Sequence, residues 1–121
     1  MVRLLGNNLS NKKKIYIALT AIYGIGISKA FDILNKLKID SNIRVAHLTE
    51  ANLSAIRDFL ESETFKLEGD LKRNISLNIK RLIEINSYRG RRHLNGLPTR
   101  GQRTRTNSKT SRQKNLFIRK K

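Results

Sequence analysis

The C-terminal part of the chain carries charge of only one sign and has little apolar material to fold around. Residues 85–121 contain twelve Lys or Arg and no Asp or Glu, whereas residues 1–84 contain fourteen basic and nine acidic side chains. Between residues 89 and 115 the only large aliphatic side chains are Leu94 and Leu97. Because ordering one residue costs ~1–2 kcal/mol of backbone entropy, this segment is expected to be disordered by itself.

The change in composition predicts a chain of two parts. The first, residues 1–88, is expected to be a folded and mildly basic domain. The second, residues 89–121, is expected to be an extended basic RNA-binding tail, which orders when a partner supplies phosphates for charge-assisted hydrogen bonds.

The excess of positive charge indicates the class of partner. The net charge is +17 and the isoelectric point is about 11.0, and such a charge attracts polyanions. A membrane-binding segment needs an amphipathic helix with a large apolar face, which the most basic part of the chain lacks. No apolar run approaches the ~20 residues that span a bilayer. Nucleic acid is therefore the expected partner, and no membrane interaction is expected.

Nothing in the composition points to catalysis or to a cofactor. Cysteine is absent, which excludes disulfides and thiolate metal sites. His47 and His93 lie far apart and have no neighbouring metal-ligand spacing. No histidine pairs with a nucleophile, and no Gly-Lys-Ser/Thr phosphate-binding loop occurs. We predict neither enzymatic activity nor a metal site.

Apolar spacing predicts an all-α first domain, a small helical bundle. Four segments repeat apolar residues three and four positions apart, which is the spacing of one helix face. The segments cover residues 15–22, 28–38, 49–62 and 70–87. Ser28 and Thr49 are expected N-caps, and Glu50 after Thr49 suits the helix dipole. The residues expected to face the core are Ile15, Ala18, Leu19, Ile22, Ala30, Ile33, Leu34, Leu37, Leu53, Ile56, Phe59, Leu60, Leu71, Ile75, Ile79, Leu82 and Ile83.

Two short motifs outside the tail are candidate phosphate contacts. In "YGIG", Gly24 and Gly26 permit a tight turn between helices. Backbone amides at the start of the next helix could bind a phosphate with Lys29 nearby, although a turn without a ligand explains the glycines equally well. In "NKKK", residues 12–14 form either a phosphate-contacting corner or a solvated start of a helix.

The tail favours RNA over DNA. No zipper, zinc finger or recognition helix precedes it. Arginine planes stack on unpaired bases as well as pairing with phosphates, which suits irregular RNA. His93, within this basic run, fits RNA contact and local packing equally well.

The sequence resembles the small-subunit ribosomal protein thirteen family. The resemblance lies in "MVRLLGNNL" (Met1–Leu9), "IALTAIYGIG" (Ile17–Gly26) and "EGDLKRNISLNIKRLIEINSYRGRRHLNGLPTRGQRTRTN" (Glu68–Asn107). These stretches occur in the family's order and spacing as far as about Arg112, and "YRGRRHLNGLPTRGQRTRTN" is highly specific to it. The last nine residues match poorly.

The resemblance implies a fold and a set of partners. The family has an N-terminal domain of the helix–two-turns–helix type and a long C-terminal extension. Its members lie in the head of the small ribosomal subunit, where they contact small-subunit rRNA and ribosomal protein nineteen of that subunit. They take part in bridges to the large subunit, including its protein five, and the tail reaches toward tRNA.

The resemblance also suggests which residues bind each RNA. The family's rRNA-binding motif corresponds to Arg89, Arg91, Arg92, Arg100, Arg103 and Arg105, to which we add His93 and the basic corner of Lys12, Lys13 and Lys14. The residues expected near tRNA are Lys109, Arg112, Lys114, Arg119, Lys120 and Lys121. The last three fall where the sequence departs from the family's pattern.

The compartment follows from composition and from the two ends of the chain. The sequence is rich in Ile, Lys and Asn, as AT-rich genomes produce, and the family's pattern starts within the first residues, which leaves no room for a transit peptide. The end of the chain is more similar to mitochondrial members. We predict a mitochondrial ribosome, with a plastid or the bacterial cytoplasm as alternatives.

A second hypothesis from another class is a free DNA-binding module of the helix–two-turns–helix type. It would use the "YGIG" turn and predicts that residues 1–84 alone bind duplex DNA.

Overall fold

The computed structural model describes residues 2–62 and 66–114. The chain forms two compact units, Met1–Lys72 and Arg73–Lys121. This division by packing falls earlier than the boundary at residue 88 that the sequence suggested, and the independent folding of residues 1–88 stays a prediction. Within the described part of the chain, no helix is both long and apolar enough to cross a bilayer.

The first unit begins with a β-hairpin that the sequence analysis did not predict. Strands β1 (Val2–Leu4) and β2 (Asn7–Leu9) pair antiparallel. The two connecting residues, Leu5 and Gly6, both have positive φ, at 45° and 82°, as the tightest hairpin turns require. Strands of three residues are too short to display the alternation that identifies a strand. The leucine that ends each strand is nevertheless buried in the core.

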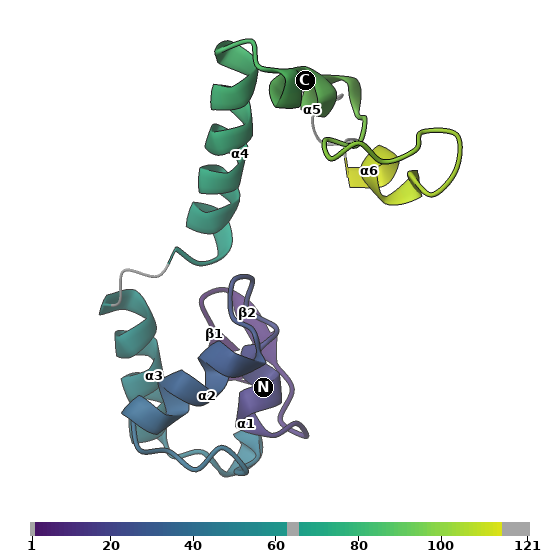
Figure 1. Cartoon of the computed structure of the whole chain (residues 1–121). Helices are drawn as coiled ribbons and strands as arrows, with labels where there is room; N and C mark the ends of the chain where they lie inside the picture. The colour runs from purple at the N-terminus through teal and green to yellow at the C-terminus, as the bar shows by residue number, and fades with distance from the viewer. Residues whose placement is uncertain (1, 63–65, 115–121) are drawn as a thin grey trace. The chain divides into compact units, whose positions relative to one another are not determined.

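The helices of the first unit follow the prediction with shifted ends (Figure 1). They are α1 (Ile15–Leu19), α2 (Ile27–Lys36), the short 3₁₀ helix η1 (Val45–His47) and α3 (Glu50–Ser62). The N-cap of α2 is Gly26 rather than Ser28. The N-cap of α3 is confirmed, because the Asn52 amide donates to Thr49 Oγ1 at 3.3 Å.

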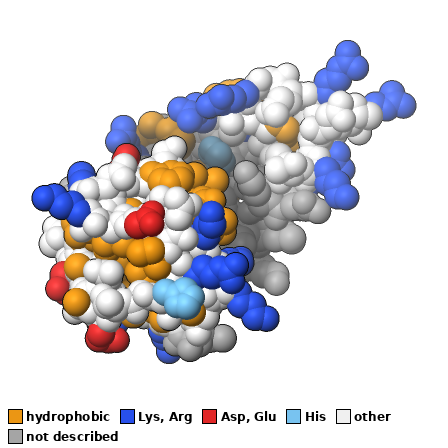
Figure 2. Space-filling view, turned by 90° about the horizontal axis from the view of Figure 1, so that it is seen from below, with side chains coloured by type: hydrophobic (Ala, Val, Ile, Leu, Met, Phe, Trp, Pro, Cys, Tyr) orange, Lys and Arg blue, Asp and Glu red, His pale blue; other side chains and the backbone are white. Residues whose placement is uncertain are grey.

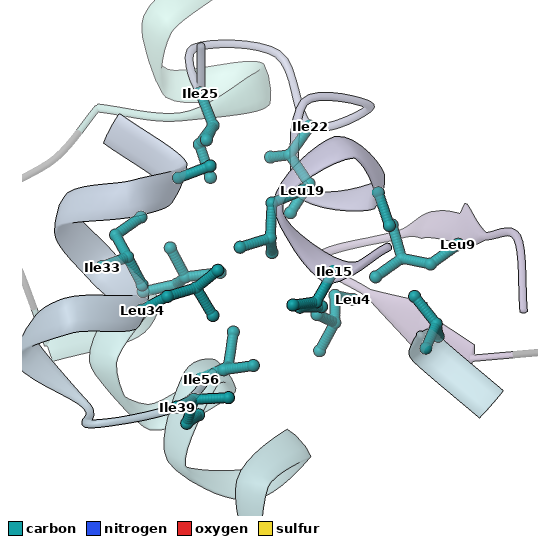
Figure 3. Close-up of a cluster of buried hydrophobic side chains, with 14 of the residues drawn as sticks. Leu4, Leu9, Ile15, Leu19, Ile22, Ile25, Ile33, Leu34, Ile39 and Ile56 are labelled. Carbon is teal, nitrogen blue, oxygen red and sulfur yellow. The ribbon is translucent and has the colours of Figure 1, made fainter. Parts of the chain in front are cut away.

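One hydrophobic cluster holds the first unit together. Figure 3 shows leucine and isoleucine side chains from the hairpin, α1, α2 and α3 pointing toward one another. The predicted inward residues of the first two helices are confirmed as buried, except Leu37, which is only half-buried. Ile39 and Val45 add buried side chains from outside the main helices.

Helix α4 (Glu68–Glu84) differs from the prediction in its packing. It starts two residues before the expected Asp70, and none of its residues is buried. The side chains of Ile75 and Leu77 are 40% and 54% exposed. The expected apolar face of this helix (Leu71, Ile75, Ile79, Leu82 and Ile83) is therefore half-buried or exposed.

The fold class is confirmed, since helices dominate the described residues and the only strands among them are the two of the hairpin. The expectation of an extended tail is wrong over two stretches of the second unit. Residues Tyr88–Asn95 form helix α5, and Lys109–Lys114 form helix α6. The helix–two-turns–helix type of the first unit stays an expectation of the family resemblance.

Candidate nucleic-acid interface

The basic segment starts at a sharp corner between α4 and α5. Asn86 has a positive φ of 58°, which turns the chain out of α4. Ser87 then caps α5, because its hydroxyl accepts from the Gly90 amide at 3.1 Å and donates to the Leu82 carbonyl at 2.8 Å. Gly90 is buried, and a Cβ placed on it would lie 2.2 Å from the Leu82 oxygen. Only glycine lets the two helices approach this closely.

Helix α5 has a regular C-terminal stop. Gly96 adopts the left-handed conformation at φ 73°. The amides of Gly96 and Leu97 donate to the carbonyls of His93 and Arg92 at 3.2 and 2.9 Å. These two bonds make a Schellman motif, which satisfies carbonyls at the end of a helix. The direction in which the chain leaves α5 is therefore fixed.

The predicted rRNA-binding arginines lie on two structures. Arg89 and Arg91 are exposed on α5, whereas Arg92 and His93 on the same helix are half-buried. The remaining three, Arg100, Arg103 and Arg105, are exposed in the connection between α5 and α6. Five of the six arginines therefore present their guanidinium groups to solvent.

No acidic residue lies in the sequence after Glu84, so the basic groups of α5 and the following connection have no carboxylate close to them in the chain. Figure 2 shows Lys and Arg side chains projecting from the surface of the molecule. Unpaired and solvated cations of this kind attract phosphate groups.

Two arginines of the segment donate to the protein itself. Arg92 Nε donates to the Pro98 carbonyl at 2.9 Å. Arg112 donates to the Thr104 carbonyl at 3.0 Å and to the Ser108 hydroxyl at 2.9 Å. Sequence reasoning had assigned Arg92 to rRNA and Arg112 to tRNA, and it missed Ser108, whose 4% exposure makes it a buried polar residue.

The residues predicted to approach tRNA lie at the end of the described chain. Lys109 is exposed at the first position of α6, and Lys114 is its last residue. Arg119, Lys120 and Lys121 lie outside the described residues.

The "NKKK" corner leads into α1. The main chain there is fixed by bonds to a distant segment, from the Val45 amide to the Lys13 carbonyl at 3.1 Å and from the Ile15 amide to the Ile43 carbonyl at 2.9 Å. The ammonium group of Lys14 donates to the Asn42 side chain at 3.0 Å. All three lysines, Lys12, Lys13 and Lys14, are exposed, and phosphate contact at this corner stays a prediction.

The "YGIG" turn is held by a carboxylate of the same chain. Glu68 Oε1 accepts from the Tyr23 amide at 2.7 Å and from Asn7 Nδ2 at 2.6 Å. Gly24 has φ 105°, and a Cβ on it would lie 2.9 Å from the Leu67 side chain. The positive φ and the close approach of Leu67 support the explanation of Gly24 as part of a tight turn. A phosphate at this turn, near Gly26 and Lys29, stays a prediction and could not use the Tyr23 amide without displacing Glu68.

These bonds change the acidity of Glu68. The hydrogen bond from the Tyr23 amide is the largest effect and lowers the pKa of Glu68 below its ordinary value of 4.5. Desolvation of the carboxylate raises the pKa, whereas the bond from Asn7 and the positive charge of Lys72 lower it further. A carboxylate stabilised in this way contributes to folding only while it is ionised.

We therefore expect Glu68→Gln to destabilise the protein at pH 7 and to matter less in acid. The contribution of Glu68 is present above its unfolded pKa and is lost as pH falls through the lower folded value. The measurement is the free energy of unfolding of both proteins between pH 7 and pH 3. The control is Glu84→Gln, because Glu84 is exposed and has only a long ion pair to Lys80, at 3.8 Å. A difference between native and Glu68→Gln that stays constant over this range would contradict the assignment.

Within the described residues, no group of His, Asp and Glu side chains is arranged to hold a metal ion. The described part of the second unit is a basic surface, built on a fixed corner, a capped short helix and a hydrogen-bonded connection.

The sequence of the chain is similar to those of known proteins. The sequence model described as ribosomal protein S13/S18 matches residues 3–110. The small ribosomal subunit protein uS13c of Porphyra purpurea is 54% identical over 112 residues, which cover 93% of this chain and 88% of that protein. The proteins of the same name from Pyropia yezoensis and Gracilaria tenuistipitata var. liui are 54% and 53% identical with the same coverage.

Proposed function

The chain belongs to the ribosomal protein S13/S18 family, and on that premise we propose that it binds small-subunit rRNA through the basic surface of its second unit. Its role is that of a structural component of the small ribosomal subunit, and it is not an enzyme. The observation that carries the proposed rRNA contact is the exposure of Arg89, Arg91, Arg100, Arg103 and Arg105 on a segment without acidic residues.

The geometry of the surface suits folded RNA. The exposed arginines lie partly on the short helix α5 and partly on the irregular connection after it, whereas a smooth duplex offers phosphates along regular lines. Guanidinium groups bind phosphates in bidentate fashion and stack on unpaired bases. The capped helix and the fixed corner keep these groups at defined positions, which favours one RNA shape over others.

We further propose contacts with tRNA and with other ribosomal proteins. The support for tRNA contact is the position of Lys109 and Lys114 at the far end of the basic segment, with three more cations at residues 119–121.

The support for protein contacts is apolar exposure on the first unit, where Ile27 is 59% and Tyr23 is 44% exposed. Exposed apolar groups of this kind suit protein interfaces. Small-subunit protein nineteen and large-subunit protein five are the proposed partners.

An organelle ribosome is the proposed location. The three relatives carry a plastid-type name, uS13c, and come from Porphyra, Pyropia and Gracilaria. These relatives do not support the mitochondrial location that the sequence suggested, and they favour its plastid alternative.

The salt dependence of RNA binding tests the central proposal. We expect log K for a fragment of small-subunit head rRNA to fall against log salt concentration with a slope of about −4 to −6, because six to eight phosphate contacts release about 0.7 counterions each. Fluorescence anisotropy titrations at several salt concentrations measure this slope. A flat response, or a protein that sediments apart from small subunits at moderate salt, would contradict the proposal.

A further inference from the structure

The side chains of Arg92 and Arg112 connect helices α5 and α6 to the loop between them. We call residues 96–108 the interhelix loop. From one side, Arg92 on α5 donates to the Pro98 carbonyl at 2.9 Å. From the other side, Arg112 on α6 donates to the Thr104 carbonyl at 3.0 Å and through two nitrogens to the Ser108 hydroxyl, at 2.9 and 3.3 Å.

The contacts within the interhelix loop are mainly polar, and no hydrophobic core is described there. The Ser108 hydroxyl of the loop is buried and donates to the Thr104 carbonyl at 3.1 Å, so Arg112 and Ser108 converge on the same acceptor. A cavity of about 180 Å³, lined in part by Leu97, Pro98 and Arg112, lies inside the loop. Among the described residues, hydrogen bonds from the two arginines join the loop to the helix on either side of it, and they help to hold it in one conformation.

The arginines of this segment therefore have two kinds of environment. In one, at Arg92 and Arg112, guanidinium nitrogens are bonded to the loop's own oxygen atoms, although Arg112 is also exposed. In the other, at Arg100, Arg103 and Arg105, the side chains are exposed on the loop. A guanidinium that donates to two acceptors has a fixed plane and few remaining donors, so it acts on the RNA mainly through the shape it gives to the loop.

We propose that Arg92 and Arg112 are positioning residues that fold the interhelix loop before RNA binds, and that Arg100, Arg103 and Arg105 are the residues of this loop that contact RNA. The proposal rests on the proposed function and deepens it. A loop that is already folded loses little conformational freedom on binding, whereas a disordered one must be ordered at that step at a cost in affinity.

Arg112→Lys in the full chain tests the positioning role. Lysine keeps the charge, but its single ammonium group cannot hold both acceptors in a fixed plane. In the RNA-free protein, we expect backbone order parameters of the interhelix loop to fall from above about 0.8 to below about 0.6. Affinity for the head rRNA fragment should fall about tenfold, the factor that corresponds to the loss of one charged hydrogen bond. The salt slope should stay unchanged, because the number of phosphate contacts is the same.

Two further variants make the test specific. Ser108→Ala removes the hydroxyl that accepts from Arg112 and donates to the Thr104 carbonyl. It leaves every charge in place, and it should reproduce the loss of order. Arg103→Lys, at an exposed position without a bond to the loop, should leave the order parameters of the RNA-free protein unchanged.

Two results would overturn the proposal. One is a native RNA-free chain whose interhelix loop has order parameters below about 0.6. The other is an Arg112→Lys protein that binds the rRNA fragment as tightly as the native chain. If the native chain does not bind the fragment at all, the proposed function fails, while the order parameters, measured without RNA, still decide whether Arg112 folds the loop.

Discussion

Removing residues 85–121 should lower the affinity for a small-subunit head rRNA fragment by about four orders of magnitude near 0.1 M salt. On single-stranded RNA, each phosphate contact releases ~0.7 counterions. Six contacts therefore raise the binding constant by about four orders of magnitude between 1 M and 0.1 M salt. The truncation removes twelve Lys or Arg and no acidic residue, while residues 1–84 retain fourteen basic and nine acidic side chains. Anisotropy titrations of both proteins, at matched salt concentrations, measure the difference.

A full-length control separates loss of charge from loss of the chain. Replacing Arg100, Arg103 and Arg105 together by glutamine should lower affinity by about two orders of magnitude near 0.1 M salt, because three contacts are lost at ~0.7 decade each. A truncated protein that binds the rRNA within tenfold of the full chain would contradict the role given to the second unit. Tight binding of duplex DNA by residues 1–84 would instead support the free DNA-binding module.

Replacing Gly90 by alanine should separate α5 from the end of α4. The added Cβ would lie 2.2 Å from the Leu82 oxygen, 2.4 Å from the Leu82 carbon and 2.7 Å from the Ile83 nitrogen. These are backbone atoms, which cannot rotate away as a side chain can. Overpacking of this kind typically costs ~1–3 kcal/mol, and α5 has little else to hold it, since Gly90 is the one residue of this helix that is buried.

The loss of the corner should be visible in both structure and binding. We expect the backbone chemical shifts of residues 88–95 to lose their helical values and rRNA affinity to fall at least tenfold, because the arginines on α5 are no longer positioned. Gly69→Ala is the matched control. Gly69 lies in the first turn of α4, and a Cβ there meets nothing within 4 Å, so alanine should not destabilise the protein. A Gly90→Ala protein with native shifts and affinity would rule out the close approach of the helices.

The segment from Tyr88 to Asn95 is helical although it has little apolar content, because local capping signals stabilise it. "SYRGRRHLNGLP" holds a serine N-cap at Ser87 and an Asn-Gly-Leu-Pro end in which Gly96 stops the helix. Such signals stabilise a helix without a hydrophobic core, so α5 could have been predicted. The role of Gly90 could not, because the sequence does not reveal which backbone will lie next to a glycine.

The same distinction applies to the apolar faces of the helices and to Glu68. The apolar spacing of α1 and α2 identified their buried faces, since a helix of fixed period places those residues on one side. The spacing of α4 was equally regular, yet its face is not buried. Periodicity reports that a face can be buried and cannot report whether another element covers it. Glu68 lay outside the predicted helices, and its bonds to Tyr23 and Asn7 join residues far apart in the chain.

The sequence by itself determined the class of the protein, because charge, apolar period and motif order are properties of the chain before it folds. They established the helical first unit, the acid-free basic segment and the resemblance to a ribosomal family. Only the tertiary structure decided which cations face solvent and which bind the protein's own carbonyls. Arg103 and Arg112 are indistinguishable in a count of charge, but only Arg112 lies within hydrogen-bond distance of Thr104 and Ser108. The bond to Ser108 spans four residues, the spacing of one helical turn, but the bond to Thr104 depends on how the loop before α6 folds back onto that helix.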